Sequence, residues 1–441
     1  MRRLRVGMVK AMFWCCVLGS LSVVRLSAQA SSGVGAVSLK VAQAEDVALR
    51  NNPRISIARL LALAQGQVTR EVRSARLPSV IGSLTAVDSH SVSRITAGAL
   101  NNPVVYQRAA GGAAISQLIT DFGRTSNLVA SAGLRAQAQA AEQMATTADV
   151  RLAADQAFYR ALAAQAVVDV AKQTVAFRQN NSDLISSLAD AKLKSTLDKS
   201  FADVNLNQAE LLLLDAKNAE DAAFADLSTV LGYERQQDFV LVDDGSATLV
   251  SPAPDLNVLT DLALRSRPDL QALDDQYRAA ERFGRAEHDL WRPTVSALGV
   301  VGGSPVRADD IASPWYGAAG VNVNIPLFNG FLYSARAKEA DYRTNAAQEQ
   351  VRDLRNRISR DVRVTWLNAQ SAYQRITVTG KLLAQASQAL DLAQTRYQLG
   401  LSSIVELSQA ELAKTSAQID NTNARFDYQE SLAAIRYQTG Q

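Results

Sequence analysis

The clearest pattern of apolar and polar positions is a short alternating run that begins at residue 321. Val321, Val323 and Ile325 are apolar, and Asn322 and Asn324 lie between them. Successive side chains of a strand point to opposite faces, so the run predicts a strand with one apolar and one polar face. A membrane β-barrel wall has this pattern, with the three apolar side chains facing lipid and the two asparagines facing the lumen. A soluble sheet with one wet face is the alternative.

Two long tracts without proline predict helices of unusual length. The chain has ten prolines, yet none lies in 104–251 and none follows residue 326. Proline removes a backbone donor and clashes with the preceding turn, so its absence favours uninterrupted helix. A helix over 332–399 would extend roughly 100 Å at about 1.5 Å per residue. Apolar positions near its end have the 3-4-3-4 spacing of a coiled-coil seam: Leu383, Ala386, Leu390, Ala393 and Tyr397.

The first half of the chain predicts the same succession of elements. Residues 38–76 have a helical pattern that is interrupted at Asn51-Asn52-Pro53, and residues 79–119 have a strand–loop–strand pattern. An Ala-rich helical tract follows from about residue 125, with a candidate break near 180–183. A second helix then ends at Leu231-Gly232.

Matching motifs indicate an internal duplication. ALRNNP at 48–53 matches ALRSRP at 263–268, and RLPSV at 76–80 matches WRPTV at 291–295, both at an offset of 215. Beyond the strands the offset is 208, as for Ser195 and Ser403. We therefore expect two repeats, at about 38–232 and 257–440, joined by a linker at about 233–256. Each repeat supplies two strands. Four strands cannot close a membrane barrel, for which about eight is the practical minimum, so several chains would have to share one.

The N-terminus has the features of a secretory signal at 1–30, which leaves 31–441 as the exported chain. Basic residues come first, an apolar run covers 11–24, and Ala28-Gln29-Ala30 fits a cleavage site. This segment holds five of the 46 Lys and Arg and none of the 43 Asp and Glu, so the remainder has a net charge of −2. We therefore expect no nucleic-acid partner. Both cysteines, Cys15 and Cys16, lie in this segment, which excludes disulfides from the remainder.

No pattern in the sequence predicts an enzyme. The two histidines, His90 and His288, lie far apart in segments of different type. A nucleophile elbow, a phosphate-binding glycine loop and a metal-spaced cluster are all missing from the sequence. We expect no catalytic residue, no cofactor and no metal site.

The sequence resembles the TolC-type outer-membrane efflux protein family. The resemblance rests on the two repeated motifs above, on LITDFGR at 118–124 with IPLFNGF at 325–331, and on YQLGLSSIVELSQAEL at 397–412. It implies a mainly α-helical fold with a small membrane β part. Long antiparallel coiled-coil helices would form a periplasmic tunnel, and a homotrimer would share one twelve-stranded barrel among outer-membrane lipids. A periplasmic adaptor (membrane fusion) protein and an inner-membrane pump would be its partners in a Gram-negative-type cell, making it the exit duct of a tripartite efflux or type I secretion system.

The resemblance also assigns functions to the two helix–turn–helix tips. The adaptor-docking candidates are Gly400, Leu401, Ser403, Lys192, Leu193 and Ser195. Lys192 stands where the family has glycine, and a lysine is strained at positive φ. Either that turn is built differently, or an adaptor meets two unlike tips.

A periplasmic constriction is the second feature that the resemblance implies. Its candidates are Glu406, Asp198, Tyr397 and Gln409, with Gln409 in place of a second acid. A ring of carboxylates would favour cations. Ser403 and Glu406 also fit a capping box, in which the serine accepts from a backbone N–H and the glutamate reaches back. Both interpretations of Glu406 stay open.

A periplasmic coiled-coil structural or adaptor-like protein is the alternative function. It explains the heptads and the signal, but not four strands placed symmetrically in a duplicated chain. The sequence does not identify the transported substrate, the class of pump, the adaptor or the resting state of the duct.

Overall fold

The helices are continuous over the lengths that the sequence predicts. The computed structural model describes residues 37–87, 108–237, 239–243, 255–306 and 313–441. The predicted signal segment, His90 and much of the linker lie outside these residues. The helices of the first repeat are α1 (Val41–Asn51), α2 (Pro53–Ser74), α3 (Arg124–Asp190) and α4 (Thr196–Val230). Those of the second are α5 (Leu256–Ser266), α6 (Pro268–His288), α7 (Leu332–Gln398) and α8 (Ile404–Gln438), with a short 3-10 turn, η1, at Asp289–Trp291.

The strands of the described residues form two sheets. A four-stranded antiparallel sheet has the order β2 (Ser79–Val87), β3 (Arg108–Thr120), β5 (Thr294–Val306) and β6 (Trp315–Asn324). A small second sheet pairs β1 (Val37–Leu39) with β4 (Phe239–Leu241). The four long strands were expected. The short strands β1 and β4 were not predicted, and β4 lies in the predicted linker.

The duplication extends to individual residues. The bounds of α3 and α4 become those of α7 and α8 when 208 is added, and those of α1 become those of α5 when 215 is added. The two hairpins share one register, since Ser79 pairs with Ser116 as Thr294 pairs with Asn324. The predicted internal duplication is therefore visible in the register of the elements.

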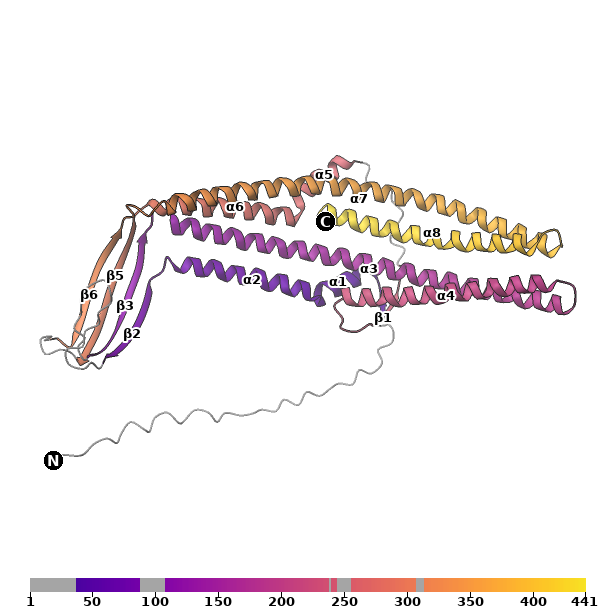
Figure 1. Cartoon of the computed structure of the whole chain (residues 1–441), viewed down its shortest axis with the longest axis horizontal. Helices are drawn as coiled ribbons and strands as arrows, with labels where there is room; N and C mark the ends of the chain where they lie inside the picture. The colour runs from indigo at the N-terminus through magenta and orange to yellow at the C-terminus, as the bar shows by residue number, and fades with distance from the viewer. Residues whose placement is uncertain (1–36, 88–107, 238, 244–254, 307–312) are drawn as a thin grey trace, which may run out of the picture. The chain divides into compact units, whose positions relative to one another are not determined.

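Each long helix is paired along its length with the shorter helices of its own repeat. In Figure 1, α4 and α2 lie beside α3, while α8 and α6 lie beside α7. α6 also packs along α3, and α8 packs on α3, which joins the two repeats. Alanine is the commonest residue at the buried positions of these helices, and small side chains let long helices approach closely.

In each repeat, a glycine after the last helix packs against the break between the first two helices. Gly232 follows α4 with φ 84°, and a Cβ there would come within 2.6 Å of the Asn51 backbone. Gly440 follows α8 with φ 72°, and a Cβ there would come within 3.0 Å of the Ser266 backbone. Positive φ and close backbone approach both require glycine. Hence the ends of α4 and α8 lie against the breaks between α1 and α2 and between α5 and α6.

One predicted helix break is wrong. The candidate break near 180–183 falls inside α3, which runs unbroken from Arg124 to Asp190. The Asn181 amide donates to the Glu411 carboxylate of α8 at 2.7 Å and so does not cap a helix end.

Candidate functional site

Most of the large apolar side chains of the four-stranded sheet lie on one face, while Ile81, Leu298 and Val300 lie on the other. Cross-strand pairs place Val323 with Val295 and Val321 with Ala297. The same face continues through Ile115, whose partners are Val80 on β2 and Gly299 on β5. Leu84 of β2 lies on this face and is 93% exposed. A large exposed apolar surface of this kind marks a surface that another apolar phase or partner covers.

The opposite face carries polar and small side chains at the helix end of the sheet. Asn322 pairs with Ser296, Asn324 pairs with Thr294, and Ser79 pairs with Ser116. The expected separation of Val321 and Val323 from the two asparagines therefore holds within β6. Ile325 lies one residue beyond the end of β6, so the strand alternation stops before it.

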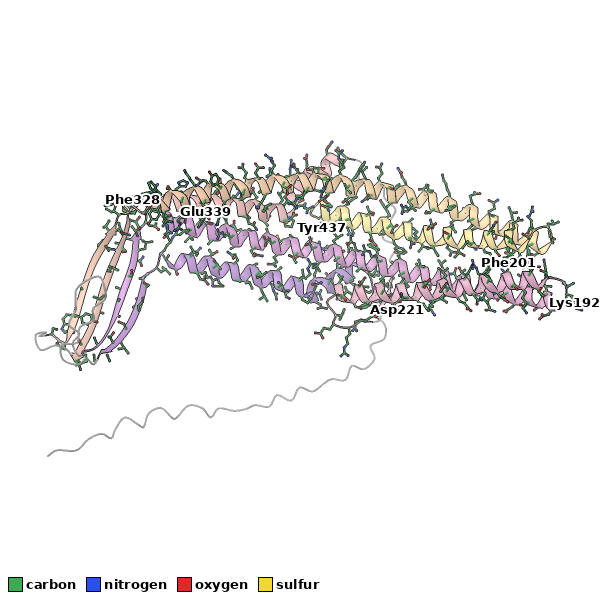
Figure 2. All side chains as sticks on the ribbon, viewed as in Figure 1. Lys192, Phe201, Asp221, Phe328, Glu339 and Tyr437 are labelled. Atoms are coloured by element: carbon green, nitrogen blue, oxygen red, sulfur yellow. The ribbon has the colours of Figure 1, made fainter. Side chains whose placement is uncertain are left out.

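Aromatic side chains gather where the sheet meets the helices. Trp291 and Tyr333 pack edge to face with centroids 5.5 Å apart, and Phe328 and Phe331 do so at 5.7 Å. Figure 2 places Phe328 at this junction. Aromatic rings at the end of an apolar sheet face are typical of the boundary between lipid and water.

The two helix–turn–helix tips have the same backbone. Lys192 has φ 59° and Gly400 has φ 72°, both left-handed. Leu193 N–H donates to Leu188 at 2.8 Å, and Leu401 N–H donates to Arg396 at 2.8 Å, as in a Schellman motif. Lys192 therefore takes up the strained conformation that glycine adopts freely, and the two turns are not built differently. Figure 2 shows Lys192 at the end of the α3–α4 pair.

The N-termini of α4 and α8, which follow the two turns, differ in one contact. Ser195 and Asp198 form a complete capping box, with bonds of 3.1 and 3.2 Å in the two directions. Ser403 Oγ accepts from Glu406 N–H at 3.3 Å, but the Glu406 carboxylate lies 3.3 Å from Arg396 Nε. The predicted return bond of Glu406 is thus replaced by an ion pair with Arg396.

Tyr397 joins the two tips. Its side chain is 7% exposed, and Lys194 Nζ of the other tip lies 3.9 Å from the centroid of its ring. Burial, together with the nearby Asp198 carboxylate, raises the pKa of Tyr397. Gln409 is exposed on α8, one turn after Glu406 and on the same face. The structure therefore brings Tyr397 and Asp198 together, while Glu406 pairs with Arg396.

A buried ion pair above the tips was not predicted from the sequence. Arg178 of α3 lies 3.8 Å from Glu411 of α8, and both side chains are nearly fully buried. Arg178 also donates to the Asn205 carbonyl of α4 at 2.7 Å. Burial raises the pKa of Glu411, against the opposing effect of Arg178. Long sequence separation hid this pair, because neither residue belongs to a local motif.

A second polar cluster joins α1, α3 and α8 at the other end of α8. Arg436 donates to Asp155 at 3.0 Å, and Tyr437 donates to Asp149 at 2.7 Å. Burial and the neighbouring Glu45 carboxyl raise the pKa of Asp155 to about 7, although Arg436 and Arg151 lower it. These contacts connect the last turn of the second repeat to the first repeat.

Two features are absent from the described part of the chain. Among those residues, no group of three or more His, Cys, Asp or Glu is placed to hold a metal ion. No helix among them is both long and apolar enough to cross a membrane.

Comparisons with known proteins agree with this arrangement. A family model described as outer membrane efflux protein matches residues 259–441. The outer membrane efflux protein BepC of Brucella suis biovar 1 is 24% identical over 431 residues, which cover 95% of this chain and 89% of BepC. The outer membrane protein TolC of Salmonella enteritidis is 26% identical over 121 residues, covering 27% of this chain and a quarter (25%) of that relative.

The fold is that of solved outer-membrane channels. The outer membrane protein VceC of Vibrio cholerae superposes with a TM-score of 0.76 at 18% identity, covering 91% of this chain and 96% of VceC. At this identity the likeness shows the fold. It confirms the predicted combination of long helices with a small β part.

Proposed function

We infer that this chain, which belongs to the outer membrane efflux protein family, forms an outer-membrane exit duct for substrates delivered by an inner-membrane pump. Transport through it would be passive, with the energy supplied by the inner-membrane pump. The exported chain corresponds to residues 31–441, with repeats at about 38–232 and 257–440.

One observation carries the proposal: the four-stranded sheet, whose strands lead into the long helices, has an exposed apolar face. Val301, Val321 and Trp315 on this face are all more than half exposed. A periplasmic coiled-coil or adaptor protein, surrounded by water, does not explain such an exposed apolar face. In a shared barrel it would face lipid, while the asparagines of β6 would face the lumen.

A homotrimer accounts for the four strands. Four strands are too few to close a barrel, and three copies would supply twelve. The periplasmic adaptor would dock at the tips formed by Gly400, Leu401 and Ser403 and by their counterparts Lys192, Leu193 and Ser195. Leu193 and Leu401 support this role, since both are more than 65% exposed at the turns.

Glu406 is the residue of the proposed constriction whose charge is most readily tested. Its carboxylate is half-exposed beside Arg396 at the tip of the helix pair. Three copies of Glu406 would attract cations to a narrow passage. The test is conductance of the purified protein in a planar bilayer, followed by the reversal potential of Glu406→Gln and Glu406→Lys in a salt gradient.

The proposal predicts discrete channels whose cation preference falls in Glu406→Gln and falls further in Glu406→Lys. A protein that conducts with unchanged selectivity in both variants would remove Glu406 from the constriction and leave the duct intact. A protein that never conducts would contradict the duct.

A further inference from the structure

The two repeats close the junction between sheet and helices with different chemistry. In the second repeat, Trp291 comes shortly before β5 and packs edge to face on Tyr333 of α7. The equivalent of Trp291 in the first repeat, at the offset of 215, is Arg76. Arg76 comes shortly before β2, and its Nη2 donates to the Ser126 hydroxyl of α3 at 2.9 Å. A guanidinium on a serine thus takes the place of one aromatic ring on another.

A second pair of equivalent positions, one turn away, differs in the same sense. In the second repeat, His288 Nε2 at the end of α6 lies 3.0 Å from Asp341 Oδ1 of α7. The equivalent residues of the first repeat are Arg73, in the last turn of α2, and Gly133 of α3. A Cβ added at Gly133 would meet no atom within 4 Å. The carboxylate beside His288 therefore has no counterpart beside Arg73, and the space at this position is open.

The two arginines are neighbours in one turn. The Arg76 N–H donates to the Arg73 carbonyl at 3.0 Å, just beyond the end of α2. Both residues are exposed. Neither guanidinium is paired with a carboxylate in the part of the chain that the structure describes. Two positive charges therefore share one turn without a negative charge to balance them.

The acidic residues closest in sequence do not balance these charges. Glu71 precedes Arg73 by two residues, which places it on another face of α2. Asp121 caps α3 and accepts from the Thr125 N–H at 2.7 Å and the Gly123 N–H at 3.3 Å. The positive charges at the end of α2 thus stay available to an anion from outside the chain.

The dipole of α2 is another explanation for basic residues at this place. Cations near a helix C-terminus are stabilised by the dipole, and Arg73 lies in the last turn. The equivalent end of α6 has His288 and Trp291, however. The dipole of such a helix therefore does not by itself require two arginines.

The duplication places the arginines at the level of the aromatic rings. Arg76 precedes the first residue of β2 by three positions, as Trp291 precedes that of β5. Gln117, on the same face of β3 as Ile115, donates to the Arg76 carbonyl at 2.9 Å. In Figure 1 the sheet ends of α2 and α3 lie side by side. The face of β3 that carries Ile115 therefore ends beside Arg76, where aromatic rings mark the boundary between lipid and water in the other repeat.

Phosphate is the anion that a phospholipid membrane presents at such a boundary. Guanidinium N–H groups match phosphate oxygens in pairs, which makes arginine well suited to bind phosphate. The bond to Ser126 holds the Arg76 guanidinium and leaves its other N–H groups for a ligand. Basic side chains near a membrane surface attract anionic lipids. Two unbalanced charges favour a headgroup with a net negative charge over a zwitterionic one.

We propose that Arg73 and Arg76 bind the phosphate of an anionic phospholipid at the lipid–water boundary of the sheet. The first repeat holds a lipid headgroup at the position where the second repeat has aromatic rings. The inference rests on the proposed function in one respect, because it requires the apolar face of the sheet to lie in lipid.

Native mass spectrometry of the full-length, detergent-solubilised protein tests the proposal, because it resolves each bound lipid. The protein is titrated with phosphatidylglycerol and, separately, with phosphatidylcholine that has the same acyl chains. We expect the unaltered protein to bind phosphatidylglycerol more tightly. Arg73→Gln and Arg76→Gln should each weaken that binding about fivefold, as expected for one basic side chain near a membrane surface, and leave phosphatidylcholine binding unchanged.

Arg70→Gln is the matched control. Arg70 is exposed on the same helix, one turn before Arg73, and its guanidinium donates to Gln67 at 3.3 Å. This variant should bind phosphatidylglycerol as the unaltered protein does. An equal loss in Arg70→Gln would show that only the overall charge of the helix matters, and it would overturn the proposal.

Three further results would overturn the proposal. The first is equal affinity of the unaltered protein for the two lipids. The second is a fall in melting temperature in Arg73→Gln and Arg76→Gln with unchanged phosphatidylglycerol binding, which would assign both arginines to the helix end. The third is displacement of the lipid by millimolar inorganic phosphate, which would make this a site for free phosphate.

Fractionation of the expressing cells separates this site from the proposed function. Protein in the outer-membrane fraction that shows no preference for phosphatidylglycerol would reject the lipid site and leave the duct intact. Protein confined to the soluble periplasmic fraction would reject the duct, and a preference measured in detergent would then have no membrane to act on.

Discussion

Arg178 of α3 and Glu411 of α8 form a buried ion pair that fastens the second repeat to the first. Their charged groups are 3.8 Å apart, and the Asn181 amide donates to the same carboxylate at 2.7 Å. Removing one partner of such a pair leaves an unpaired charge in the interior, which costs about 3–5 kcal/mol. We expect Glu411→Ala to lower the melting temperature of the detergent-solubilised protein, followed by circular dichroism.

The control for that prediction removes both charges. Arg178→Met with Glu411→Leu should recover most of the lost stability, because apolar side chains of similar size avoid the cost of desolvating charge. A double variant less stable than Glu411→Ala alone would show that the pair contributes through attraction, against this account.

The raised pKa of Asp155 should make the stability of the folded protein depend on pH. Its pKa rises from 3.8 to about 7 in the folded protein, first through burial and then through Glu45, with Arg436 and Arg151 opposing. Between these two values the folded state holds a proton that the unfolded state has lost. The stabilising contribution is therefore complete below about pH 4 and is lost as pH rises through about 7. We expect Asp155→Asn to flatten the fall in melting temperature between about pH 5 and pH 7.

Asp169→Asn is the matched control, since Asp169 is an exposed carboxylate on the same helix. It should leave the pH profile unchanged. If Asp155→Asn and Asp169→Asn both reproduce the profile of the unaltered protein, another group is responsible for the pH dependence.

Replacing Lys192 with glycine is expected to stabilise the α3–α4 tip. A left-handed residue with a side chain costs about 1 kcal/mol or more relative to glycine, and Lys192 has φ 59°. Lys192→Gly should therefore slow hydrogen exchange of the Leu193 amide, which closes the turn by donating to Leu188. Gly400→Ala at the other tip should speed exchange of the Leu401 amide. No change in either variant would contradict the strain assigned to this conformation.

The two faces of β2 predict opposite outcomes for neighbouring substitutions. Leu84 lies on the apolar face and Ser83 on the opposite face. An arginine facing lipid costs about 2–4 kcal/mol at the middle of a bilayer, whereas the lumen face tolerates charge. Leu84→Arg should reduce the amount of protein in the outer-membrane fraction on immunoblots, and Ser83→Arg should not. Equal loss in both variants would argue against a lipid-facing side.

The sequence predicted elements with strong local patterns and missed those without. The tracts without proline predicted the long helices correctly. The alternating pattern predicted the strand hairpins, and the matching motifs predicted the duplication. The three-residue strands β1 and β4 are too short for any periodicity to reveal them. The conformation of Lys192 was left open, because glycine is the usual residue at such a turn and a lysine there could also have signalled a different turn.

At the site, sequence reasoning placed the two turns and the N-cap at Ser403 correctly. It could not find Arg396 beside Glu406, nor Lys194 over Tyr397, because each contact depends on how two helices or two tips come together. The Arg178–Glu411 pair was missed for the same reason. The roles assigned to the tips and to the constriction remain predictions.

The native mass of the detergent-extracted protein from a purified outer-membrane fraction tests the central claim most directly. A shared barrel predicts a trimer in that fraction, because one chain supplies four strands with two open edges. A monomer or dimer in the soluble periplasmic fraction would contradict the account, and the sheet would then belong to a soluble protein.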